Sequence, residues 1–140
     1  MSQSTFITET LSVSINRNRI GRVALWALQV GLAALFLFAG GSKLAGAPAM
    51  VALYDAIGVG QWFRLVTGLI EVVSAAALLL PAFAPFGALL LGSTMVGAIA
   101  THLLIVGGSP ALPALLLVGS LVVVWARRRQ LSAALSRVRA

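Results

Sequence analysis

Few residues of this sequence could take part in acid–base or electrostatic chemistry. The 140 residues include three acidic side chains, one histidine and ten basic side chains. Eight of the ten basic residues are arginines near the two ends of the chain, which leaves Lys43 and Arg64 between them. With Glu71 and His102, these two lie within or beside long apolar runs, where ionisable groups are costly and usually functional.

Four apolar runs position these residues. Each is near the length of about 20 residues that crosses a bilayer, and none shows the alternation of a β-strand. Because an unpaired backbone is costly in lipid, we predict helices. The expected fold is an all-α, polytopic four-helix transmembrane bundle with helices at about 23–42, 63–80, 86–106 and 111–126.

The composition excludes a soluble protein. Hydrophobic residues make up 60% of the chain and charged residues 9%, with a mean hydropathy of +1.04, whereas soluble domains carry about 25% charged residues. The absence of cysteine excludes disulfides, thiolate chemistry and iron–sulfur clusters within the chain. One histidine and three acidic residues do not make a multi-ligand zinc site. No room remains for an extramembrane catalytic domain.

The basic residues predict the orientation. The net charge is +7, and the basic residues lie at the edges of the apolar runs. The expected partner is therefore the anionic inner leaflet and not a nucleic acid. Four crossings place both termini on one side, and the positive-inside rule makes that side the cytoplasm. Trp26 and Trp125 then lie at the inner interface and Trp62 at the outer one. The first run could also be a cleaved signal, but it exceeds the 7–15 residues of a signal core.

Three further segments flank the spans. Residues 1–22 form a polar basic tail that we expect to be disordered before its arginines. Pro48 can start, and Gly58 can end, a short helix that lies on the outer face. The basic tail at 127–140 places Leu131, Leu135 and Val138 at helical spacing, which suggests either an amphipathic helix on the inner leaflet or a frayed end.

Polar residues recur on matching faces of three predicted helices. Arg64, Thr67, Glu71 and Ser74 follow spacings of 3, 4 and 3, which puts them on one stripe. Gln29, Phe36 and Lys43 repeat by sevens on the first helix, and Met95 (or Thr94), Ala98 and His102 share a face of the third. Packing these faces inward predicts a core that is polar in its outer half and apolar below. Small residues would allow close packing: Gly40, Gly68, Ser93 and Gly97.

Two interpretations of this polar cluster remain open. In the first, Glu71 pairs with Lys43 or Arg64 only to satisfy a buried charge and fix the helix register. In the second, the cluster lines a pocket that opens to the outer half, where Glu71 and His102 handle protons and Lys43 or Arg64 attracts a ligand oxygen. An axial haem is disfavoured, because His102 has no second ligand or attachment motif beside it.

Three segments carry a family resemblance. FLFAGGSKLAG at 36–46, the stretch 53–81 with Gly-x-x-Glu at Gly68 and Glu71, and Ala-Thr-His-Leu closing the third run resemble the DoxX family of small four-helix membrane proteins. The resemblance covers about residues 24–125. It implies a bacterial inner-membrane protein associated with membrane redox enzymes, such as thiosulfate:quinone oxidoreductase and oxidative-stress complexes. By motif position, Lys43 and Glu71 correspond to the family's polar pair.

The leading hypothesis is an accessory or quinone-interacting subunit of a membrane oxidoreductase, rather than an independent enzyme. Quinone would be its cofactor, with nothing bound covalently, and its protein partners would be an oxidoreductase subunit and further copies of the chain. The site would comprise Lys43, Arg64, Thr67, Glu71 and His102. Two alternatives are a small carrier or permease for a lipophilic or anionic solute and a structural scaffold without chemistry of its own.

Overall fold

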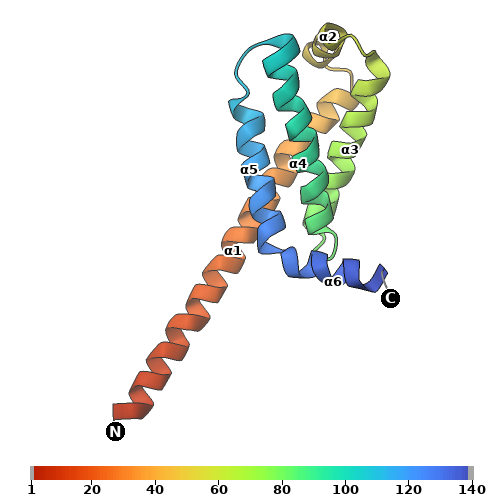
Figure 1. The fold of residues 1–140 in the computed structure, drawn as a ribbon. Helices are drawn as coiled ribbons and strands as arrows, with labels where there is room; N and C mark the ends of the chain where they lie inside the picture. The colour runs from red at the N-terminus through yellow and green to blue at the C-terminus, as the bar shows by residue number, and fades with distance from the viewer. Residues whose placement is uncertain (1, 139–140) are drawn as a thin grey trace.

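The computed structural model describes the backbone of residues 2–138 and the side chains of residues 17–137, and the regular elements of this range are all helices (Figure 1). The elements are, in order, α1 (Ser2–Leu44), α2 (Pro48–Ile57), α3 (Gln61–Leu79), α4 (Ala84–Thr101), the π-helical turn η1 (His102–Val106), α5 (Ala111–Ala126) and α6 (Arg128–Val138).

Four helices form the bundle. α1 packs against α3, α3 against α4, and α4 against α5, while α5 also returns to α1 (Figure 1). The short helix α2 covers one end of this bundle and α6 lies across the other, from which the N-terminal part of α1 projects away. We refer to these as the α2 end and the α6 end.

The predicted membrane spans are largely present. Three helical segments are long and apolar enough to cross a bilayer: 17–44, 61–79 and 84–106. α5 has 16 residues, about 24 Å of helix, and qualifies as a fourth span only together with α6, from which it is bent by 63°. The chain is therefore a helical membrane bundle with three or four spans.

The flanking segments are more helical than expected. α1 begins at Ser2, so the polar residues that we expected to be a disordered tail are helical in the structure. Extending a helix that the apolar span has already nucleated adds one hydrogen bond per residue, and no proline interrupts the chain before Pro48. The predicted helix from Pro48 is confirmed; it ends at Gly58, whose φ of 78° is the left-handed conformation that glycine favours. The tail after Trp125 forms the helix α6.

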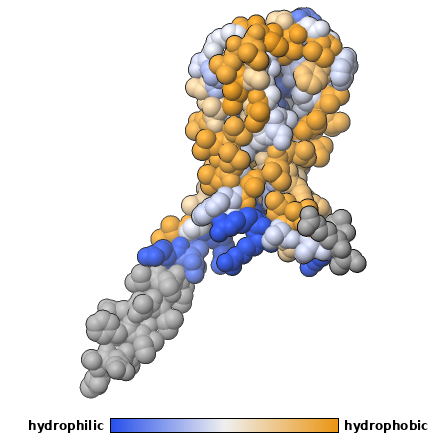
Figure 2. All heavy atoms as spheres, viewed as in Figure 1, coloured by the Kyte–Doolittle hydropathy of each residue, from blue (hydrophilic) through white to orange (hydrophobic). Residues whose placement is uncertain are grey.

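The bundle interior is mainly aliphatic. Each of the four long helices contributes side chains to one buried cluster, whereas many leucines and valines on the outer faces are exposed. Figure 2 shows the hydrophobic surface that covers the bundle. Outward apolar side chains are expected where the solvent is lipid. The buried cluster comprises Leu32, Ala33, Phe36, Ala75, Leu78, Ala88, Leu91, Met95 and Val123.

Two pairs of small residues set the helix spacing. A Cβ added to Gly40 would lie 2.8 Å from the carbonyl oxygen of Gly68, so α1 and α3 approach with backbone against backbone. Gly87 does the same between α4 and α3, because its Cβ would lie 2.6 Å from the carbonyl oxygen of Ser74. The prediction for Gly40 and Gly68 is confirmed, but that for Ser93 and Gly97 is wrong, since both are exposed on the lipid side of α4.

Gly40→Ala should destabilise the bundle. Its new methyl group would meet backbone, which cannot move cheaply, so we expect a loss of roughly 1–3 kcal/mol in unfolding free energy. Gly31→Ala on the same helix is the matched control, because nothing lies within 4 Å of the added atom. Unfolding in detergent by titration with dodecyl sulfate measures both. Equal stability of the two variants would contradict the packing role of Gly40.

Candidate functional site

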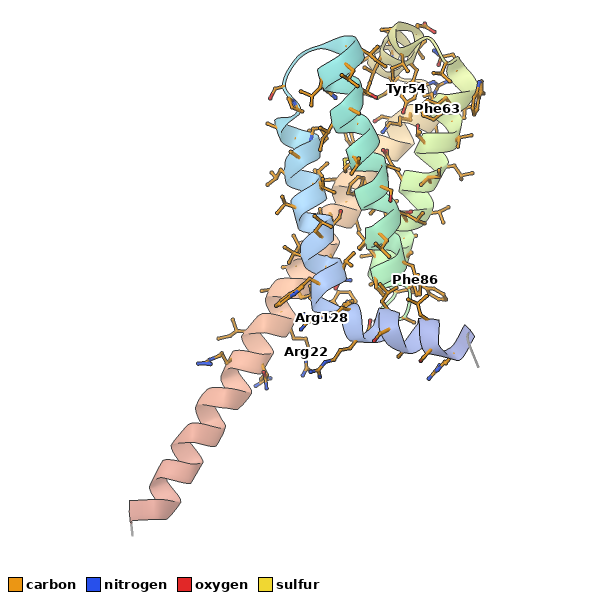
Figure 3. All side chains as sticks on the ribbon, in the orientation of Figure 1. Arg22, Tyr54, Phe63, Phe86 and Arg128 are labelled. Carbon is orange, nitrogen blue, oxygen red and sulfur yellow. The ribbon has the colours of Figure 1, made fainter. Side chains whose placement is uncertain are left out.

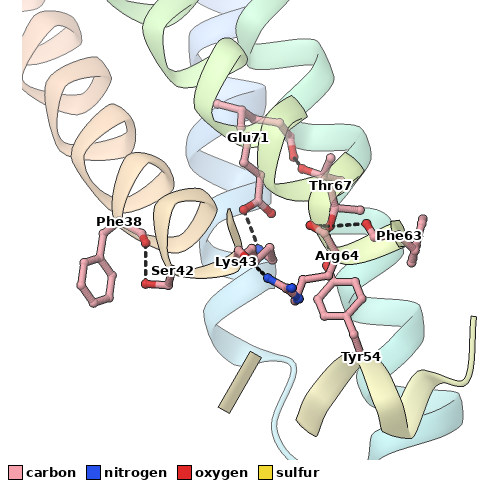
Figure 4. A network of polar contacts seen from close by, with 10 residues as sticks. Phe38, Ser42, Lys43, Tyr54, Phe63, Arg64, Thr67 and Glu71 are labelled. Atoms are coloured by element: carbon pink, nitrogen blue, oxygen red, sulfur yellow. Dashed lines mark hydrogen bonds and ion pairs between the residues drawn. The ribbon is translucent and has the colours of Figure 1, made fainter. Parts of the chain in front are cut away.

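An ion pair joins α1 to α3 at the α2 end of the bundle (Figure 4). Lys43 Nζ lies 2.5 Å from Glu71 Oε2, and the two side chains are 13% and 3% exposed. Lys43 occupies the last turn of α1, and the contact between Gly40 and Gly68 brings that turn against α3. The sequence left open whether Glu71 pairs with Lys43 or Arg64, and the structure shows Lys43.

Arg64 forms a hydrogen bond with the backbone of α1 and no ion pair with Glu71. Its Nη1 donates a hydrogen bond to the carbonyl oxygen of Lys43, and its Nε donates to Gln61 Oε1 at 2.6 Å. The last carbonyl groups of a helix lack partners within the helix and carry partial negative charge. A buried guanidinium at this place therefore stabilises the end of α1 while leaving Glu71 to Lys43.

The short helix α2 is attached to the same cluster through hydroxyl groups. Tyr54 is buried, and its hydroxyl lies 2.5 Å from Thr67 Oγ1. Thr67 can direct its own proton to the carbonyl oxygen of Phe63 or Arg64, in which case Tyr54 is the donor. Burial is the main reason that the pKa of Tyr54 is raised above its ordinary value, so the phenol keeps its proton at neutral pH.

A glutamine completes the attachment of α2. Gln61 Nε2 donates to Asp55 Oδ1 at 2.6 Å and to the carbonyl oxygen of Val51 at 3.0 Å. Because Gln61 Oε1 also accepts from Arg64, polar contacts run from the exposed Asp55 to the buried ion pair. We call the seven residues joined by these polar contacts the α2-end cluster: Lys43, Tyr54, Asp55, Gln61, Arg64, Thr67 and Glu71.

The structure brings four of the five predicted site residues together and places the fifth apart. His102 Nδ1 lies 2.8 Å from the carbonyl oxygen of Ala98 in its own helix, and no hydrogen bond links it to Lys43 or Glu71. A carbonyl only accepts, so Nδ1 is the donor in this contact. His102 begins η1, which packs against α2.

Sequence reasoning did not assign Tyr54 and Gln61 to the site. Tyr54 is the one tyrosine of the chain and sits on the helix predicted at the surface, while Gln61 precedes Arg64 by one helical turn. The sequence showed both features, but the contacts of Tyr54 and Gln61 depend on how α2 packs against α3. Among the residues with described side chains, no three acidic or histidine side chains lie close enough to share a metal ion.

A second polar contact was also missed, at the α6 end. Gln29 is completely buried, donates through Nε2 to the carbonyl oxygen of Leu78 at 2.7 Å, and accepts at Oε1 from Arg127 Nη2 at 2.8 Å. The prediction that the core is apolar below the outer cluster is therefore wrong at this position.

A family comparison bears on this arrangement. The family model described as the DoxX-like family matches residues 27–134, which include the complete α2-end cluster. The chain belongs to the DoxX-like family. The resemblance inferred from the helix 1 and Gly-x-x-Glu motifs is thus confirmed. No curated protein and no solved structure shows significant similarity to this DoxX-like chain.

Breaking one side of the ion pair should cost more than removing both charges. Glu71→Gln leaves the Lys43 ammonium without its counter-ion, and Lys43→Met leaves the carboxylate, each at a cost of about 3–5 kcal/mol. The double variant buries no unpaired charge. We expect its loss of unfolding free energy in detergent to be clearly smaller than the sum of the single losses. Additive losses would show that the two side chains do not interact.

Proposed function

We propose that this DoxX-like protein is an accessory subunit of a membrane oxidoreductase system and that its α2-end cluster binds a quinone. The observation that supports this proposal is the juxtaposition of a buried ammonium–carboxylate pair with a buried phenol–hydroxyl pair, in a lipid-exposed bundle. Ionisable groups within membrane helices are costly, and a functional ligand is a common reason for them.

The donor groups of the cluster fit a quinone. Its two carbonyl oxygens accept hydrogen bonds, and its isoprenoid tail needs an apolar environment. Lys43 Nζ has three N–H donors, one of which is engaged by Glu71, and the Tyr54 O–H, which donates to Thr67, would turn to the ligand when a quinone binds. Lys43 would donate to one ligand oxygen, while Glu71 would hold Lys43 in place. The quinone, when bound, supplies the capacity to carry electrons and protons.

An accessory role follows from the composition. The sequence contains no cysteine and one histidine, so it offers few ligands for a redox centre of its own. We therefore propose that electrons pass between the quinone and a separate oxidoreductase subunit, and that this chain contributes the binding groups within the membrane.

We place the α2 end on the outer side of a bacterial inner membrane. Arginines of α1 and α6 lie near each other at the opposite end, as Arg22 and Arg128 show in Figure 3, and the positive-inside rule assigns that end to the cytoplasm. The exposed Trp62 lies in the first turn of α3 at the α2 end, and the exposed Trp125 lies at the other end. Indole rings favour the two interfaces of a bilayer, which supports this placement.

One observation favours the scaffold alternative. The charged groups of the cluster already have protein partners: Lys43 with Glu71, Arg64 with the end of α1, and Asp55 with Gln61. A cluster satisfied in this way could serve only to hold α2 and the bundle together. Function retained by the folded double variant Lys43→Met, Glu71→Gln would support that reading.

Purified protein in detergent should bind short-tailed benzoquinones or naphthoquinones. Tyr54→Phe keeps the ring but removes the O–H, and Lys43→Met removes the ammonium. We expect each to weaken binding by about tenfold, because a hydrogen bond from a charged or buried donor contributes roughly 1.5 kcal/mol or more. Equilibrium titration measures the affinity. Glu71→Gln should weaken it as well.

The control is Ser93→Ala, on the exposed face of α4, which should bind as the wild type does. Each variant is first shown to remain folded by its helical circular dichroism. Absence of binding by the wild type, or unchanged affinity in both Tyr54→Phe and Lys43→Met, would refute the quinone site.

A further inference from the structure

A cavity of about 390 Å³ lies at the α6 end, far from the α2-end cluster. This volume is within the range of small-molecule sites, about 300–1,000 Å³. Three arginines line it, and none of its lining residues is acidic. The residues that matter here are Arg22 and Trp26 of α1, Pro81 of the α3–α4 turn, Arg127 between α5 and α6, and Arg129 and Gln130 in the first turn of α6.

Arg127 is held in a fixed position. The buried Gln29 accepts hydrogen bonds from its Nη2 at 2.8 Å and its Nε at 3.2 Å, and Gln29 is itself fixed by the carbonyl oxygen of Leu78. Nη1 of Arg127 makes a longer contact of 3.4 Å with Gln130. A guanidinium has five N–H donors, so two remain for a ligand.

No carboxylate among the described side chains, those of residues 17–137, forms an ion pair with these arginines. Among the residues whose side chains are described, the ion pair found is Lys43–Glu71, at the other end of the bundle. Arg127 is partly buried, and its guanidinium keeps its positive charge in the protein. A charge that has lost part of its hydration without gaining an anion is a ready partner for one.

The surroundings also indicate the kind of anion. Trp26 and Pro81 give the cavity an apolar wall, and α6 turns by 63° from α5 beside it, as a helix at a membrane surface does. Figure 2 shows the hydrophilic residues gathered where α1 and α6 leave the apolar bundle. The planar fork of arginine matches the oxygens of a phosphate.

We propose that this cavity is a phosphate-binding site, with Arg127 as the fixed donor and Arg22 and Arg129 as the exposed donors that close on the ligand. The phosphate can be that of an anionic phospholipid headgroup or of a soluble phosphate ester, since both present the same oxygens. This site is separate from the quinone site and does not depend on it.

Arg128 provides a matched control. It lies between Arg127 and Arg129 in the sequence and carries the same charge, but it does not line the cavity. Its guanidinium lies 4.6 Å from the centre of the Trp125 ring and donates to the carbonyl oxygen of that residue. Figure 3 shows Arg128 with Arg22 at the same end of the bundle. If lipids were attracted only by the overall surface charge, removing Arg127 or Arg128 would weaken binding equally. If they bind in the cavity, removing Arg127 would weaken binding more.

The test is native mass spectrometry of the full chain, titrated with phosphatidylglycerol and, separately, with phosphatidylcholine of the same acyl chains. Both lipids carry the phosphate, but the quaternary ammonium of choline would lie against three arginines, so we expect phosphatidylglycerol to bind about tenfold more tightly. Arg127→Gln should remove most of that preference, as the loss of a charge-assisted hydrogen bond would. Arg128→Gln should keep it. Because Arg127 also contacts Gln29, the exposed Arg22→Gln serves as a second variant that leaves the fold contacts intact.

Competition with soluble glycerol phosphate identifies the source of the phosphate. Displacement of the lipid at millimolar concentration assigns the site to soluble phosphates as well, and failure to displace assigns it to the headgroup; either result supports the site. Equal binding of the two lipids without any binding of glycerol phosphate would overturn it. Equal losses in Arg22→Gln, Arg127→Gln and Arg128→Gln would overturn it too, because they would show attraction to the surface charge alone.

Discussion

The backbone contact between α1 and α3 is the constraint on which the rest of the α2 end depends. Gly40 and Gly68 lack the atoms that would hold these helices apart, so Lys43 can reach Glu71 at 2.5 Å. In a membrane a buried carboxylate needs such a counter-ion, because neither water nor lipid can take its place. Packing and electrostatics therefore act as one unit: the helices cannot separate without uncovering a charge.

The polar groups of the bundle divide into two sets with different surroundings. At the α2 end the charges are paired within the protein, and the short helix α2 is held over them by Tyr54 and Gln61. At the α6 end, Gln29 links Arg127 to the carbonyl oxygen of Leu78, yet the arginines there find no protein carboxylate among the described side chains. The charged groups at the α2 end have protein partners, whereas the arginines at the α6 end are available to groups of the surrounding membrane.

Much of this architecture could be predicted because local rules determine it. Apolar runs located the spans, Pro48 and Gly58 bounded α2, and helical spacing put Glu71 on the buried face of α3. Contacts that depend on packing could not be predicted. Spacing alone could not decide whether Glu71 pairs with Lys43 or Arg64, and the contact between Gln29 and Arg127 joins residues 98 positions apart. The side chain of His102 forms a hydrogen bond with the carbonyl oxygen of Ala98 in its own helix, and helical spacing does not predict that contact.

The short length of α5 has a consequence for the lipids around it. Its 16 residues extend about 24 Å, less than the roughly 30 Å of a typical hydrocarbon core, before the chain bends into α6. Such a hydrophobic mismatch is relieved when the bilayer thins locally or the helix end is drawn inward. Local thinning brings lipid headgroups level with an end of α5. A bilayer that adjusts in this way would be thinner beside α5 than beside the longer helical segments 17–44 and 84–106.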